Sequence, residues 1–299
     1  MKPIYYYLLI FIFLTSALVS CKPGSSSKKP KTVESYIFQD GIQDKLYPAE
    51  EQELEFKSSG SSIYGFEYVA NGKGPHPTVI LLHGLPGNER NLDLAQNLRR
   101  AGYNVIYFNY RGSWGSKGTF GFDNAIADTK AVIDYISDPA HATSMQIDTT
   151  RIALIGHSMG AGMAIINGMN DKRVKAVVGM SVFNPYTLLQ GKDAPSNLGS
   201  LKEYLLTLGM LNCDPNKFLN DMLANIEQYN IEQMVAKSSK PLLVIDEHQS
   251  NNYLSKYSKK RNLQYKIWDT DHPFTNKRIA LSREIKNWLD KNLLSPKSK

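Results

Sequence analysis

The chain has 299 residues, 42% of them hydrophobic and 21% charged, a globular composition that excludes a disordered or collagen-like polymer. Its length fits one large domain or two small ones. The net charge of +7 includes five lysines that precede the first acidic residue, Glu34; without them 30 basic residues face 28 acidic ones, so the charge does not indicate a nucleic-acid-binding face.

The amino terminus carries an apolar run over residues 4–19, which is short for a membrane span and has the length of a signal-peptide core. The run ends in Leu-Val-Ser-Cys, with the cysteine at position 21. This ending resembles the lipobox of bacterial lipoproteins, in which the leader is cleaved before a cysteine that carries diacylglycerol. The resemblance implies a signal peptide over residues 1–20, lipidation of Cys21 and a lipid-anchored, extracytoplasmic place in the bacterial cell envelope. The alternative is a transmembrane anchor that ends near a cysteine.

A polar stretch follows the cysteine. Residues 22–31 are lysine, proline, glycine and serine only, a composition that favours a flexible, self-repelling linker. We expect residues 21–50 to form a tether to a folded domain over residues 51–299. Cys213 is the second of two cysteines. If Cys21 carries lipid, no internal disulfide can form, and Cys213 is expected to be buried or inert.

From about residue 51, strand patterns alternate with amphipathic helices, which predicts a mostly parallel central sheet with helices on both faces. Residues 53–57 and 61–70 predict an opening antiparallel hairpin. The last helix is expected from residue 276 to about 292, with a buried stripe of Ile279, Ile285, Trp288 and Leu289. Between them, strands are predicted at 78–82, 104–109, 151–155, 175–180, 241–245 and 264–268, and helices at 91–101, at 123–136 and from 159.

The alternation stops between residues 184 and 240, where helical patterns such as 201–211 and 218–229 intervene. A helical insertion at this point would lie over the carboxyl ends of the parallel strands. Ligands bind at that edge in open α/β sheets. We therefore predict a small helical lid over residues 184–240.

The clearest chemical motif is Gly156-His157-Ser158-Met159-Gly160, which joins a predicted buried strand to a predicted helix. A serine on such a tight turn has a strained backbone and raises its hydroxyl above the sheet, provided that its neighbours are small. A glycine-containing turn at residues 81–87 can aim a backbone N–H at a developing oxyanion, with the N–H of Met159 as the second donor. Read alone, it is equally well an ordinary glycine turn.

Downstream, His272 follows the last predicted strand, and the order of serine first and histidine last is the one found in α/β-hydrolases. His272 is the candidate base for Ser158. His83 and His157 flank turns and are interpreted as structural. The segment 110–122 is rich in glycine and aromatics; it either lines a pocket, through Trp114 and Phe120, or closes a turn over the sheet.

Residues 53–293 resemble an α/β-hydrolase, in the serine-peptidase-like and esterase-like branch related to prolyl oligopeptidases. Four motifs carry the resemblance: Leu-His-Gly-Leu-Pro-Gly at 82–87, Asn-Tyr-Arg-Gly-Ser-Trp-Gly-Ser at 109–116, Gly-His-Ser-Met-Gly at 156–160 and Asp-His-Pro-Phe at 271–274. The resemblance implies that Ser158 is the nucleophile and His272 the base. It also implies oxyanion donors at Leu85 and Met159.

The acid of this constellation normally lies in a loop after the strand predicted at 241–245. Here the strand is followed at once by Asp246 and Glu247 without a glycine, so the loop looks shortened. Both carboxylates are candidates to orient His272. We favour Asp246, because shortening the loop would bring the acidic pair onto the family's acidic position. Glu247 remains the second candidate, and Asp246 can also be read as a solvated strand-end carboxylate.

These residues predict a serine hydrolase that cleaves an ester or amide of a small molecule or peptide through an acyl-enzyme. No cofactor or metal is implied, because the sequence has neither a His-Glu-x-x-His helix nor a cysteine cluster. The expected partners are the substrate and a membrane, but no nucleic acid; the oligomeric state stays open. The alternative is a hydrolase-fold binding or scaffold lipoprotein whose altered acid loop has abolished turnover.

Overall fold

The computed structural model describes residues 34–247 and 252–294. The predicted signal peptide, Cys21 and residues 22–33 of the predicted tether lie outside the described residues. Within the described part, no helix is both long enough and apolar enough to cross a membrane.

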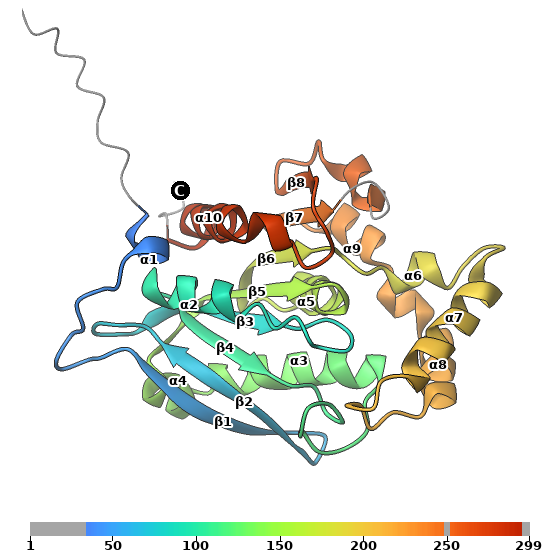
Figure 1. Cartoon of the computed structure of the whole chain (residues 1–299), viewed down its shortest axis with the longest axis horizontal. Coiled ribbons are helices and arrows are strands. Elements are labelled where there is room, and N and C mark those ends of the chain that lie inside the picture. Colours follow the sequence, from blue (N-terminus) through green and yellow to red (C-terminus); the bar gives the residue numbers. More distant parts are fainter. Residues whose placement is uncertain (1–33, 248–251, 295–299) are drawn as a thin grey trace, which may run out of the picture. The chain divides into compact units, whose positions relative to one another are not determined.

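The centre of the domain is one sheet of eight strands in the order β1-β2-β4-β3-β5-β6-β7-β8 (Figure 1). The first two strands form the predicted antiparallel hairpin, β2 pairs antiparallel with β4, and all other neighbours are parallel. The carboxyl ends of the parallel strands therefore meet at one edge. The bounds are β1 Glu50–Ser58, β2 Ser61–Val69, β3 His76–Leu82, β4 Asn104–Phe108, β5 Ile147–His157, β6 Val174–Met180, β7 Leu242–Glu247 and β8 Leu263–Trp268.

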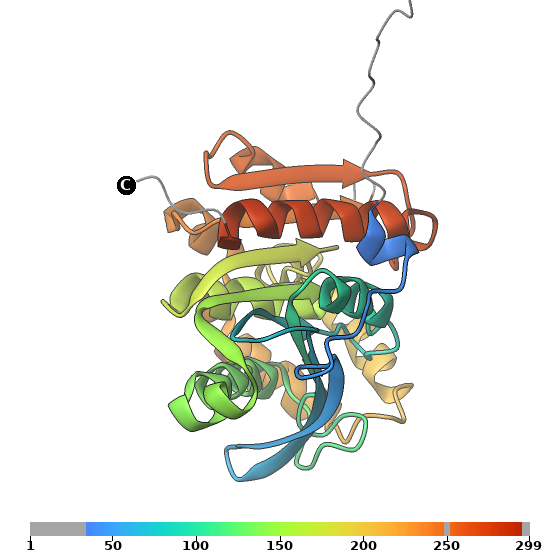
Figure 2. The same ribbon diagram turned by 90° about the vertical axis from the view of Figure 1, so that its left-hand side faces the viewer.

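Helices cover both faces of the sheet, as predicted (Figures 1 and 2). Helices α2 (Leu92–Arg100) and α10 (Arg278–Leu289) pack on one face, and α3 (Phe122–Ser137) and α5 (Met159–Asn170) pack on the other. The parallel strands are apolar on both sides because both sides are covered. In β3 all seven residues are buried. The short helix α1 (Ser35–Phe38) contacts α2, and the short helix α4 (Pro139–Ser144) contacts α3 and β5.

The buried stripe of α10 differs from the predicted one at one position. Ile285, Trp288 and Leu289 are buried, but Ile279 is 48% exposed and Leu281 takes its place in the core. Leu281 lies four residues before Ile285, one helical turn away, whereas Ile279 lies six residues before it and points to another side of the helix.

The folded unit begins at Glu34, not at residue 51 as predicted. Arg283 of α10 donates to the Glu34 carboxylate at 2.6 Å, and Arg100 at the end of α2 donates to the Tyr36 carbonyl at 2.7 Å. The N–H of Asp44 donates to the side chain of Asn71 at 2.7 Å. Residues 34–49 are therefore part of the domain, because partners distant in sequence hold them there.

The predicted lid region is helical. It contains α6 (Pro185–Leu188), α7 (Ala194–Leu206), α8 (Pro215–Ala224) and α9 (Ile231–Lys237). Helices α7 and α8 lie at the end of the domain toward which the parallel strands point, whereas α1 lies at the opposite end (Figure 1). The remaining short turns are η1 Ile226–Tyr229, η2 Asn252–Tyr257, η3 Thr275–Lys277 and η4 Asp290–Leu294.

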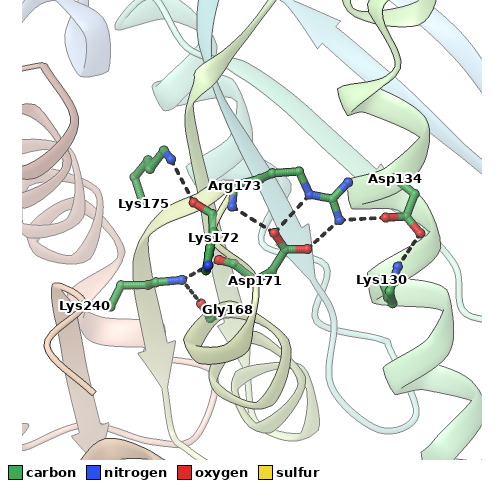
Figure 3. Close-up of polar contacts among 8 residues, drawn as sticks. All are labelled: Lys130, Asp134, Gly168, Asp171, Lys172, Arg173, Lys175 and Lys240. Atoms are coloured by element: carbon green, nitrogen blue, oxygen red, sulfur yellow. Dashed lines mark hydrogen bonds and ion pairs between the residues drawn. The ribbon is translucent and has the colours of Figure 1, made fainter. Parts of the chain in front are cut away.

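A polar network holds the carboxyl end of α5 (Figure 3). The Lys240 ammonium group donates to the carbonyl oxygens of Gly168 and Asp171, the latter at 2.6 Å. Burial lowers the pKa of Lys240 to about 8, although the nearby Asp171 carboxylate opposes the shift. A cation at a helix carboxyl end also interacts favourably with the helix dipole. The helix that begins next to Ser158 is thus fixed at its far end.

The first turn of α5 approaches the end of β3 very closely. A β-carbon at Gly160 would lie 2.2 Å from the carbonyl oxygen of Leu82 and 2.5 Å from that of His83. A β-carbon at Gly156 would lie 2.0 Å from the carbonyl oxygen of Gly160. These neighbours are backbone atoms that cannot move without shifting a strand or helix, so both positions require glycine.

Gly160→Ala is expected to destabilise the protein by about 2 kcal/mol, since overpacking costs about 1–3 kcal/mol. Gly199→Ala is the matched control, because Gly199 lies within α7 and an added β-carbon there meets nothing within 4 Å. Alanine favours a helix interior over glycine by up to about 1 kcal/mol, so the control should be at least as stable as the wild type. Urea unfolding measures both; a Gly160→Ala variant as stable as the wild type would contradict the close approach.

Candidate active site

Ser158 lies at the junction of β5 and α5 in a strained conformation, with φ 56° and ψ −120°. Its N–H donates to the carbonyl oxygen of Met180 at 2.9 Å, and its own carbonyl oxygen accepts from the N–H of Ala161 at 3.0 Å. These bonds fix the turn from both sides. The predicted strand–serine–helix arrangement is therefore present, with the side chain of Ser158 partly exposed at the carboxyl edge of the sheet.

The two predicted oxyanion donors lie beside this serine. Leu85, Met159 and Ser158 all line the same cavity. A β-carbon at Gly84 would lie 2.9 Å from the β-carbon of Ser158, so the turn before Leu85 packs directly on the serine. Within residues 34–247 and 252–294, no group accepts a hydrogen bond from the N–H of Leu85 or of Met159. Both donors are free to bind an oxyanion.

His272 is paired with Glu247. Its Nδ1 donates to Oε1 of Glu247 at 2.8 Å, and the histidine side chain is 51% exposed whereas the glutamate side chain is 4% exposed. Burial alone would raise the pKa of Glu247, but the hydrogen bonds from His272 and Ser181 outweigh it and hold the pKa below its usual value. An ionised carboxylate on Nδ1 leaves Nε2 as the proton acceptor of the imidazole.

Asp246, the predicted acid, does not contact His272, and the preference for it is corrected to Glu247. Its carboxylate accepts hydrogen bonds from the N–H of Val182 and the hydroxyl of Tyr265, both at 2.9 Å. Successive residues of a strand point to opposite faces. Glu247 therefore points to the same face of β7 as Ile245, the face that α10 covers. The loop with His272 leads into α10, so it reaches Glu247 and not Asp246. Burial raises the pKa of Asp246 to about 7.

His157 has a part in the site that the sequence interpretation missed. Its Nε2 donates to the backbone carbonyl of His272 at 2.8 Å, and the two rings lie 4.7 Å apart between centroids. Burial, with a contribution from His272, lowers the pKa of His157 to about 4, so the ring stays neutral. The residue before Ser158 thereby holds the loop that carries His272. No local sequence signal could show this contact, because the two histidines are 115 positions apart.

Ser181 was also missed. It follows β6, has φ 50°, and its hydroxyl donates to Oε2 of Glu247. Oγ of Ser181 also lies 3.4 Å from the carbonyl oxygen of His272. The sequence did offer one indication that Ser181 belongs to the site: it directly follows a predicted parallel strand, and such positions lie at the edge where ligands bind.

The structure places Ser158 and His272 at the same edge, connected through His157. Among the residues that the structure describes, none forms a hydrogen bond with Oγ of Ser158, so the hydroxyl is free to meet a substrate. Catalytic hydrogen bonds are often long in unliganded enzymes and tighten when substrate binds. The arrangement supplies a hydroxyl, an imidazole with an ionised carboxylate behind it, and two free N–H donors.

A cavity of about 170 Å³ opens at Ser158. The lid supplies four of its lining side chains, from Leu201 and Tyr204 of α7 and from Phe218 and Met222 of α8. The predicted lid therefore lies over the candidate site. Tyr204 also reaches back to the turn beside Ser158, where its hydroxyl lies 3.4 Å from the carbonyl oxygen of Leu85.

The glycine- and aromatic-rich segment 110–122 fastens the lid. The N–H of Asn212 donates to the carbonyl oxygen of Gly112 at 2.7 Å, and Phe120 stacks on Phe218 with centroids 5.9 Å apart. Trp114 donates through Nε1 to the carbonyl oxygen of Pro86 at 2.7 Å. Neither Trp114 nor Phe120 lines the cavity at Ser158, but Phe122, the last residue of the segment, does. The segment therefore closes the turn over the sheet and also reaches the pocket, through a residue other than the two expected.

Cys213 lies apart from this site and is a partly buried free thiol. Burial raises its pKa to about 11, with a smaller contribution from Asp214. A thiol with so high a pKa is a poor nucleophile at neutral pH. In the described part of the chain, no group of three or more histidine, cysteine, aspartate or glutamate residues is arranged to hold a metal ion.

Comparisons with known proteins also indicate similarity to hydrolases. A family model described as BD-FAE matches residues 67–197. Among curated proteins, the chain is similar to the uncharacterized protein YfhR of Salmonella typhi, with 28% identity over 166 residues that cover 50% of this chain and 55% of YfhR. The chain spans about half the length of the curated relatives it matches.

Solved structures share the fold over most of the chain. Est1E of Butyrivibrio proteoclasticus with bound ferulic acid is 16% identical, with a TM-score of 0.61 over 81% of this chain and 100% of that chain. An esterase of Pyrococcus furiosus is 20% identical, with a TM-score of 0.59 over 82% of this chain and 92% of that chain. The fold is that of the α/β-hydrolases, as the sequence motifs predicted.

The neighbouring carboxylates allow a matched test of the acid. Glu247→Gln is expected to lower kcat on an activated ester by about 10³- to 10⁴-fold, because the amide no longer favours the productive tautomer of His272. Asp246→Asn is expected to cost less than about tenfold, because Asp246 contacts Val182 and Tyr265 instead. Steady-state kinetics distinguish them; a larger loss from Asp246→Asn would reverse the assignment.

His157→Phe tests the support of His272. Phenylalanine retains the ring packing but removes the donor to the His272 carbonyl, so we expect kcat to fall by about tenfold to a hundredfold with a smaller change in KM. Kinetics on the same ester measure both constants, and His157→Gln, which keeps a donor, should restore part of kcat.

His141→Phe is the control for this substitution, since His141 stacks on Tyr135 far from the site, with centroids 3.8 Å apart. Equal kcat values for His157→Phe and His141→Phe would show that His157 does not position His272.

Proposed function

We propose that the protein is a serine hydrolase that cleaves an ester or amide through an acyl-enzyme intermediate on Ser158. The observation that carries the proposal is the 2.8 Å hydrogen bond between His272 and the buried Glu247. The loop that carries His272 is held by His157, the residue before Ser158. A polar pair of this kind, at the ligand-binding edge of the sheet, fits general-base catalysis.

In the proposed reaction, His272 Nε2 takes the proton of the Ser158 hydroxyl as Oγ attacks the acyl carbon. The N–H groups of Leu85 and Met159 bind the oxyanion that develops. Loss of one such donor lowers kcat by a factor of about 10²–10³. His272 then gives the proton to the leaving group, which departs. Water, activated by the same imidazole, hydrolyses the acyl-enzyme and regenerates Ser158.

The main argument for the alternative, a binding or scaffold protein without a catalytic acid, no longer holds. That alternative was based on the shortened loop after β7, and Glu247 supplies a carboxylate at the required place without a longer loop. The short loop therefore does not imply an impaired site.

Within the serine-hydrolase class, we propose that the bond is a carboxylic ester. The solved structures described above include an esterase and Est1E with bound ferulic acid, a small aromatic acid. The resemblance of the four sequence motifs to the branch related to prolyl oligopeptidases leaves a peptidase-like amide substrate as the second candidate. The cavity at Ser158 favours a compact substrate group over a peptide, because it is small and its inner end is lined by buried side chains of the lid.

We further propose that the mature protein is a lipoprotein, anchored in the bacterial envelope through diacylglycerol on Cys21. The Leu-Val-Ser-Cys ending of the apolar leader and the basic stretch of residues 22–31 support this location. The chain enters the described domain at α1, at the opposite end from the lid (Figure 1).

A fluorophosphonate probe tests the proposed nucleophile. The wild-type protein should become covalently labelled, because Ser158 is activated and the free N–H groups stabilise the phosphonyl oxygen. The Ser158→Ala variant should not be labelled above the background of heat-denatured protein, and peptide mass spectrometry should place the adduct on Ser158. Wild type and variant labelled to the same low extent would contradict the proposal and favour the scaffold.

A further inference from the structure

We propose that the cavity beside Ser158 is an acyl pocket that accepts a compact, uncharged apolar acyl group, about as large as a phenyl ring, with the lid residue Met222 limiting its size. The inference rests on the proposed serine-hydrolase function and names the substrate class of that site. It predicts esters of small apolar acids on larger, polar alcohols.

The exposure of the lining residues indicates which end of the cavity is closed. Phe122, Phe218 and Met222 are each at most 3% exposed, whereas Tyr204 is 42% exposed and Ser158 is partly exposed. The first three therefore form the inner wall, and Tyr204 lies at the mouth. A substrate group that enters past Ser158 meets a closed end made of side chains.

The position of His272 decides which part of the substrate enters. The tetrahedral intermediate directs its oxyanion to the N–H groups of Leu85 and Met159, and its leaving group toward the imidazole that protonates it. His272 is not among the residues that line the cavity, and its side chain is half exposed. The leaving group therefore lies toward solvent, and the acyl group is left for the cavity.

The chemistry of the wall excludes charged acyl groups. The residues that line the cavity include no ionisable acid or base other than the Tyr204 phenol, whose hydroxyl lies beside the carbonyl oxygen of Leu85. A carboxylate or ammonium in the inner part would lose its hydration without gaining a partner, which makes its binding unfavourable. An apolar acyl group gains from the same burial.

The volume sets an upper limit. The cavity measures about 170 Å³, close to an engineered apolar cavity of about 150 Å³ that binds benzene. A benzoyl group or a chain of about six carbons is therefore the expected occupant. A dodecanoyl chain would have to displace the inner wall.

Met222 is the residue best placed to set this limit. It is fully buried on α8, and its flexible thioether can fill the space that a smaller acyl group leaves. Met234, on α9, is partly buried and does not line the cavity, so the same substitution there serves as a matched control.

The test compares p-nitrophenyl acetate, hexanoate, dodecanoate and hemisuccinate, with rates normalised to the fraction of protein that a small fluorophosphonate labels. The wild type should prefer hexanoate, with kcat/KM for dodecanoate and hemisuccinate lower by at least about tenfold. In Met222→Phe the ratio of kcat/KM for hexanoate to that for acetate should fall by at least about tenfold, while Met234→Phe should keep the wild-type ratio.

A second variant covers the case in which Met222→Phe does not fold. Met222→Ala enlarges the cavity and should raise the rate on p-nitrophenyl octanoate, which is added to the panel for this variant, relative to the hexanoate. Labelled protein whose acyl preference is the same in all Met222 variants, or that cleaves dodecanoate or hemisuccinate as fast as hexanoate, would overturn the acyl pocket and leave the serine hydrolase standing. Protein that is neither labelled nor active would overturn the proposed function, and this inference with it.

Discussion

The conformation of Ser158 is the constraint on which the site depends. Strand β5 and helix α5 meet at this one residue, which places its backbone at φ 56° and ψ −120°, a strained conformation that costs of order 1–3 kcal/mol. The turn persists because its N–H binds Met180, and its carbonyl oxygen accepts from three amides, including that of Phe183. The required glycines at 156 and 160 and the free N–H of Met159 follow from the same turn.

The second half of the site comes from the next strands of the sheet, β6 to β8, and is joined to the first by His157. Strand β6 pairs with β5 and β7 pairs with β6, which brings Ser181 and Glu247 to the edge where Ser158 lies. His272 arrives from the loop before α10, held through its side chain by Glu247 and through its backbone by His157. The candidate site thus depends on several strands of the parallel sheet, because Ser158, Ser181, Glu247 and His272 lie at or after the ends of β5, β6, β7 and β8.

The elements that depend on local pattern could be predicted from the sequence. Buried apolar runs gave the strands, and the short motif around Ser158 gave the turn, because both signals lie within a few residues. Choosing between Asp246 and Glu247 required knowing which face of β7 the His272 loop reaches, and both faces of that strand are apolar. The start of the domain was missed for a similar reason, since Glu34 is held by a residue 249 positions away.

The lid is the part of the structure on which the proposed substrate selectivity depends. Helices α7 and α8 close a cavity that the sheet edge alone would leave open, and segment 110–122 holds them in place. A crystal structure of the protein after reaction with a phosphonate ester tests the central claim most directly. The account predicts phosphorus bonded to Oγ of Ser158, its oxygen bound by the N–H groups of Leu85 and Met159, and Nε2 of His272 within hydrogen-bond distance of the adduct. An imidazole directed away from the adduct, or an adduct on another residue, would contradict it.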